Sequence, residues 1–76
     1  MLQQIGKRIK QLRMDKLNMT QEDFAKTLGV DRTYLSRIES GKQNITVNTL
    51  VFICNKLDVT LKEFFSDFNN EKGCGK

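Results

Sequence analysis

The sequence predicts a compact all-α domain of five helices, and two observations support this fold class. Apolar residues make up 38% of the 76-residue chain and recur at helical spacing, while proline and tryptophan are absent and no segment alternates Val, Ile and Thr as a strand would. In addition, one signature of a helix start occurs four times along the chain. A chain of this length buries only about 60% of the surface that its unfolded form exposes, so we expect modest stability.

The repeated signature is a hydrophobic staple, in which an apolar residue before the N-cap pairs with another five positions later. Each staple here has a Thr or Asp at the N-cap position, where a side-chain oxygen can accept from a free N–H of the first turn. The four staples are Met19-Thr20 with Phe24, Val30-Asp31 with Leu35, Ile45-Thr46 with Leu50, and Val59-Thr60 with Phe64. Thr60 and Glu63 also complete a capping box.

Residues that favour a left-handed backbone indicate where the helices end. They are Asn18, Gly29 and Gly41. Together with the starts, they predict helices at about 2–17, 21–28, 32–40, 47–57 and 61–68. The fourth helix carries a broad apolar face made of Val47, Leu50, Val51, Ile53, Cys54 and Leu57. We expect residues 1–68 to form one domain and residues 69–76 to be a flexible tail, because the tail has nothing to bury.

The connection between the second and third predicted helices is very short, so these helices are expected to cross at a steep angle. Ala25 lets the two backbones approach, and the apolar residues of both helices share one core. The outer face of the third helix then exposes Arg32, Thr33, Ser36 and Arg37, with Tyr34 at its flank. Guanidinium groups beside small hydroxyls suit the edges of bases in a DNA major groove.

The net charge of +4 is unevenly distributed. Within the first 18 residues only Asp15 opposes five basic groups, which are Lys7, Arg8, Lys10, Arg13 and Lys16. Clustered positive charge suits a polyanion, although many solvated helix faces are equally basic.

Composition also argues against several classes of protein. No stretch approaches the roughly 20 apolar residues of a membrane span, and the N-terminus has no apolar core of signal-peptide length. We therefore expect a cytoplasmic protein with no membrane partner. The chain has two cysteines and no histidine, so a four-ligand zinc site is not expected. We also expect no cofactor, no small-molecule ligand and no enzymatic activity, since no catalytic constellation is present.

The segment TQEDFAKTLGVDRTYLSRIESGKQNIT resembles the helix-turn-helix of the lambda-repressor-like (Cro/XRE-type) regulators. The resemblance runs from about Ile5 to Phe65. Its motifs are Gln21-Glu22-x-x-Ala25, Gly29-Val30, Ser36-x-Ile38-Glu39-x-Gly41-Lys42 and Leu57-x-Val59. Residues 31–36 are also similar to the controller proteins of restriction–modification systems, a compact branch of the same family. The resemblance implies a transcriptional regulator that binds specific sequences of double-stranded DNA.

One departure from the family pattern lies at the end of the first helix. The basic residue that often lies seven positions before the family's Gln is here Arg13, eight positions before Gln21, and Asn18 replaces the usual Gly. We expect the first turn to be one residue longer. The resemblance implies an ion pair between Arg13 and Glu39, and the additional residue weakens the case for that pair.

The resemblance and the exposed face together suggest roles for individual residues. Arg32, at the start of its helix, can contact guanine O6 and N7 in bidentate fashion, which is worth roughly 1–3 kcal/mol of discrimination. Thr33, Ser36 and Arg37 are the other candidates for reading bases. The candidates for gripping the DNA backbone are Gln21, which contacts phosphate in the family, and Tyr34, Lys42, Asn44, Thr46 and Asn48. The alternative for each is ordinary solvated polarity.

Apolar residues near the end of the chain predict a homodimer with two-fold symmetry. Phe52 points away from the main stripe of its helix, and we do not expect a monomer of this size to bury all the apolar groups of the last helix. The candidates for the dimer interface are Phe52, Leu61, Phe64, Phe65 and Phe68. Alternatives that remain open are a monomer with an apolar surface, a phage-type repressor or antitoxin of the same fold, and a protein-binding helical module that does not bind DNA.

Overall fold

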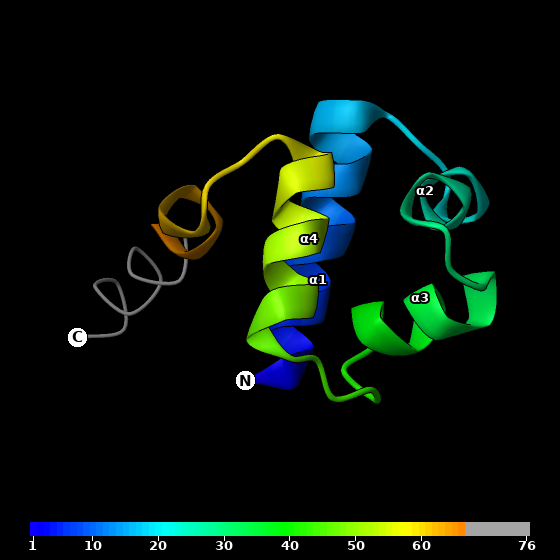
Figure 1. The fold of residues 1–76 in the computed structure, drawn as a ribbon, viewed down its shortest axis with the longest axis horizontal. Coiled ribbons are helices and arrows are strands. Elements are labelled where there is room, and N and C mark those ends of the chain that lie inside the picture. Colours follow the sequence, from blue (N-terminus) through cyan, green and yellow to red (C-terminus); the bar gives the residue numbers. More distant parts are fainter. Residues whose placement is uncertain (67–76) are drawn as a thin grey trace.

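The computed structural model describes residues 1–66, which form five helices and the turns that connect them. They are α1 (Leu2–Leu12), which continues into the π-helical turn η1 (Arg13–Leu17), then α2 (Gln21–Leu28), α3 (Arg32–Glu39) and α4 (Val47–Leu57), followed by a helix at 61–66. In Figure 1, α2 and α3 lie on one side of α1 and α4, and the 61–66 helix lies on the opposite side. The predicted all-α architecture of five helices is confirmed.

The predicted helix starts are confirmed, with one difference in detail. Thr20 and Thr46 are N-caps whose hydroxyl oxygens accept from the backbone N–H of the third helical residue, each at 3.1 Å. Asp31 is the N-cap of α3, but its side chain makes no capping hydrogen bond. The inner partners of the four staples are all buried: Phe24, Leu35, Leu50 and Phe64. Each staple therefore packs its helix start against the core.

The helix ends also follow the sequence signals. Asn18, Gly29 and Gly41 have φ values of 51°, 74° and 79°, in the left-handed region. Asp58 at the end of α4 has φ 60° as well, and no signal in the sequence marked it. The left-handed residues allow the backbone to turn directly from one helix towards the next.

The core is built from one stripe of each helix. Ile9, Phe24, Leu35, Leu57 and Phe64 have no exposed surface. The apolar face of α4 is narrower than predicted, because Val47 is 71% exposed and Val51 is 36% exposed. Among residues 1–66, no helix is long and apolar enough to span a membrane. Phe68 and the expected tail at 69–76 lie outside the described residues.

The first helix is helical to Leu17, but its last turn is a π turn. The N–H of Asn18 donates to the carbonyl of Arg13, five positions earlier, where an α-helix would use four. A π turn holds one residue more than an α turn, so it accommodates the additional residue between Arg13 and Gln21. The longer first turn is thus a widening of the helix itself, and it does not displace Arg13.

Candidate nucleic-acid interface

The outer side of α3 carries the polar residues that the sequence assigned to it. Arg32, Thr33 and Arg37 are exposed, and Ser36 and Tyr34 are half-buried. The opposite side of the helix is formed by Leu35 and Ile38, which are 0% and 2% exposed. We call the outer residues the recognition face: Arg32, Thr33, Tyr34, Ser36 and Arg37. Because the inner side of α3 is anchored so completely, the recognition face has a fixed direction relative to the domain.

The C-terminal end of α3 rests directly on α1. A side chain at Gly6 would collide with the backbone carbonyls of Ile38 and Glu39, so this contact requires glycine. Just beyond α3, a Cβ on Gly41 would lie 2.7 Å from the Cα of Gln3. These close approaches, together with the tight turn at Gly29, hold both ends of α3.

A buried ion pair ties the first helix to the third. Arg13 Nε donates to Glu39 Oε2 at 2.9 Å and its Nη2 donates to Oε1 at 3.2 Å. Its remaining Nη1 donates to the backbone carbonyl of Met19 at 2.7 Å. Both side chains are at least nine-tenths buried. The pair implied by the family resemblance is therefore present, and the expectation that the additional residue would weaken it is wrong, because the π turn absorbs that residue.

Gln21 belongs to the same network. Its Nε2 donates to Glu39 Oε1 at 3.0 Å, so the first residue of α2 is held by the last residue of α3. The sequence pointed to Gln21 as a contact to phosphate but not to its bond with Glu39. No signal in the sequence identifies this bond, because the two residues are brought together by the crossing of α2 and α3.

The loop from α3 to α4 and the start of α4 carry most of the residues predicted to contact the DNA backbone. Lys42 and Asn44 are exposed there, and Asn48 is exposed on the first turn of α4. The hydroxyl of Thr46 caps α4 and also donates to Thr49 Oγ1 at 3.0 Å. Thr46 thus already has partners within the chain, unlike its three neighbours, for which no side-chain bond is seen among residues 1–66.

Three basic residues of α1 and η1 make hydrogen bonds within the chain, although Lys16 is itself exposed. Arg8 donates to backbone carbonyls of the 61–66 helix, Arg13 is buried, and Lys16 Nζ donates to the carbonyl of Asp58 at 2.9 Å. Lys7 and Lys10 remain exposed. The count of basic residues near the N-terminus therefore overstates the charge available to DNA.

The residues assigned to a dimer interface divide into two groups. Phe52 is 43% exposed, Leu61 is 38% exposed and Phe65 is half-buried. Phe64 is completely buried in its own chain, with its ring centroid 5.0 Å from that of Phe65. The assignment of Phe64 to an interface is therefore wrong, because a side chain without exposed surface cannot reach a second copy.

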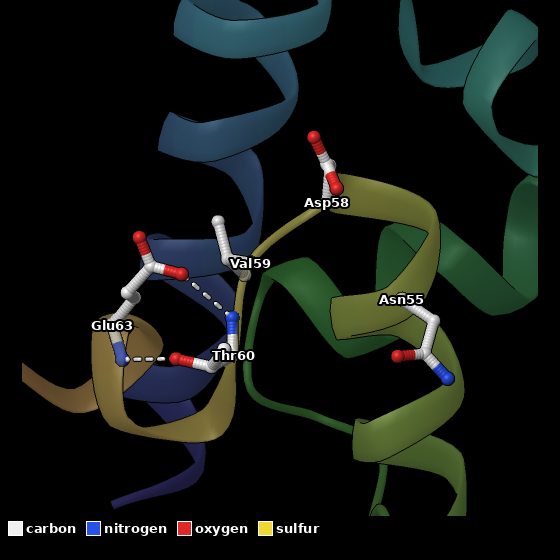
Figure 2. Close-up of a pocket in the computed structure, with 5 residues that line it drawn as sticks. All are labelled: Asn55, Asp58, Val59, Thr60 and Glu63. Carbon is white, nitrogen blue, oxygen red and sulfur yellow. Dashed lines mark hydrogen bonds between the residues drawn. The ribbon is translucent and has the colours of Figure 1, made fainter.

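The corner between α4 and the 61–66 helix is organised by a capping box (Figure 2). Glu63 Oε1 accepts from the N–H of Thr60 at 2.9 Å, and the N–H of Glu63 donates to Thr60 Oγ1 at 3.0 Å. These hydrogen bonds, with the nearby charge of Lys16, lower the pKa of Glu63 below its ordinary value. On α4, burial raises the pKa of the Cys54 thiol, which favours its protonated form.

Comparison with known proteins shows which family this chain resembles in sequence and fold. Residues 9–64 match the helix-turn-helix family model. The chain is 44% identical over 66 residues to the control protein C.MunI of Mycoplasma sp, covering 87% of this chain and 89% of that protein. It is 39% identical over 56 residues to the antitoxin PezA of Streptococcus pneumoniae, covering 74% of this chain and 35% of the antitoxin. The crystal structure of the restriction–modification controller protein C.Esp1396I superposes with a TM-score of 0.80 at 38% identity, covering 92% of this chain and 91% of that one.

Proposed function

Since the chain belongs to the Cro/XRE-type helix-turn-helix family and is a DNA-binding transcriptional regulator, we propose that it controls a restriction–modification system as a homodimer on a symmetric DNA site. The observation that carries this proposal is the likeness to control proteins, which spans nine-tenths of both chains in the structural comparison. The likeness to the antitoxin spans about a third of that protein, so it supports the antitoxin alternative less well.

The recognition face is the proposed reader of sequence. In a major groove, Arg32 presents a bidentate guanidinium to guanine, and Arg37 lies on the same exposed side of α3. Thr33 and Ser36 contribute a methyl group and hydroxyls for contacts with the neighbouring bases.

The proposed grip on the DNA backbone comes from the borders of α3. Lys42, Asn44 and Asn48 contact phosphates on one side, while Gln21 and the hydroxyl of Tyr34 contact them on the other. Such contacts set the register of the protein on DNA without reading its sequence. Thr46 contributes to the contact with the DNA backbone indirectly, because it caps the start of α4.

The proposed homodimer forms through an apolar face, which we define as Val51, Phe52, Leu61 and Phe65. Two-fold symmetry then places the two α3 helices in successive major grooves, about 34 Å apart. Replacing Phe52 by Ser removes an exposed ring from this face and should weaken dimerisation in sedimentation equilibrium. Met14→Ser is the matched control, because Met14 is a 52% exposed apolar residue on η1.

Selection of bound sequences from a random pool of DNA duplexes tests the proposal as a whole. We expect the selected site to have two-fold symmetry and to occur beside a restriction endonuclease gene in the native genome. An asymmetric site would contradict the homodimer, and a symmetric site far from any such gene would contradict the controller role.

A further inference from the structure

One basic residue of α1, Arg8, makes a structural contact with the last helix. Arg8 is half-buried, and it reaches from α1 to the 61–66 helix. Its Nε donates to the carbonyl of Phe64 at 3.1 Å and its Nη2 donates to the carbonyl of Glu63 at 3.3 Å. Hydrogen bonds from a charged donor are stronger than neutral ones, so this contact holds the backbone of the helix and not only a side chain.

A second cation holds the corner that precedes this helix. Lys16 Nζ donates to the carbonyl of Asp58, the left-handed residue that ends α4. The same lysine lies near enough to Glu63 to favour its ionised form. Arg8 and Lys16 thus contact the last helix and the turn before it, both from the first helical segment of the chain.

A helix as short as 61–66 is not stable by itself, so its orientation depends on what it packs against. One anchor is apolar, the completely buried ring of Phe64. Phe65 also packs against the core, and a polar contact comes from the guanidinium of Arg8 on the adjacent carbonyls. The contact of Arg8 with the backbone carbonyls adds a polar restraint on rotation of the helix about the buried ring of Phe64. That rotation decides whether Leu61 and Phe65 face the same way as Phe52 on α4.

We propose that Arg8, assisted by Lys16, is a positioning residue for the homodimer: it orients the 61–66 helix so that Leu61 and Phe65 form one surface with Phe52. This inference rests on the proposed homodimer, and its partner is a second copy of this chain. It assigns to Arg8 a role in assembly in place of the contact with DNA that its charge alone would suggest.

The test compares Arg8→Met with Lys7→Met in sedimentation equilibrium, using the full chain. Each variant loses one positive charge from α1, but Lys7 is exposed and donates to no side chain or carbonyl seen within residues 1–66. We expect the dimer dissociation constant to rise about tenfold or more for Arg8→Met, the loss of one charge-assisted contact, and to change less than about twofold for Lys7→Met.

The experiment distinguishes the role of Arg8 from the homodimer on which that role depends. A wild-type protein that is monomeric at all concentrations overturns the homodimer and this role with it. A dimeric wild type whose dissociation constant is unchanged by Arg8→Met overturns the role of Arg8 alone. Should Arg8→Met lose its helical circular dichroism, Arg8→Lys replaces it. That variant keeps the charge with fewer donors, and a dissociation constant equal to that of wild type would equally overturn the role.

Discussion

The buried pair between Arg13 and Glu39 makes the strongest prediction about stability. Arg13→Met keeps the apolar stem but removes all three hydrogen bonds of the guanidinium. Glu39 is then a buried carboxylate whose remaining side-chain donor is Gln21. Removing one partner of a buried pair costs about 3–5 kcal/mol. A chain of this length is stable by roughly 4–11 kcal/mol in total, so the variant should be close to unfolding.

The double variant Arg13→Met with Glu39→Leu distinguishes the buried charge from the loss of contacts. With both charges gone, we expect most of the stability to return, leaving a loss of about 1–2 kcal/mol because the carbonyl of Met19 and the amide of Gln21 lose their partners. Urea denaturation followed by circular dichroism measures both free energies of unfolding. A loss below about 1 kcal/mol for the single variant, or a double variant less stable than the single one, would show that the unpaired carboxylate of Glu39 does not dominate the cost.

Two further predictions concern a glycine and a helix cap. Gly41→Ala and Gly29→Ala both place a side chain at positive φ, at a cost of about 1–2 kcal/mol. Only Gly41 lies close to the backbone of Gln3, so Gly41→Ala should lose about 1 kcal/mol or more of stability beyond Gly29→Ala in urea denaturation. Equal losses for the two variants would argue against the close contact. Glu63 has a lowered pKa in the folded chain, so its contribution is present above its ordinary value of 4.5 and is lost as the pH falls through the folded value. Glu63→Gln should therefore reduce the acid-induced fall in melting temperature, and identical pH profiles would contradict this.

The helix starts could be predicted because their signals are local. A staple and an N-cap involve residues within six positions, and all four starts are where these residues place them. The staple at Val59 also implies that Phe64 packs inward, as the structure shows. Counting apolar residues in the last helix instead assigns Phe64 to an interface. The local signal is the better guide, because it specifies which side of the helix faces the core.

Long-range contacts could not be predicted in the same way. The bond from Arg8 to Phe64 joins residues 56 positions apart, and the ion pair of Arg13 joins residues 26 positions apart. Charge composition does not distinguish a lysine that faces solvent from an arginine that packs inward. The π turn could not be predicted for a related reason. An additional residue can lengthen a loop or widen a helix, and which of these occurs depends on the long-range contact of Arg13 with Glu39.

We propose that Arg32 on the recognition face reads a base, and a comparison of affinities for two kinds of DNA tests this role. Arg32→Ala is measured on the selected DNA site and on random duplex, beside Lys26→Ala, which removes one exposed charge from α2. We predict that Arg32→Ala weakens binding to the selected site by about 1–3 kcal/mol and weakens binding to random DNA no more than Lys26→Ala does. An equal loss on both kinds of DNA would contradict base reading by Arg32 and leave it a contact to phosphate.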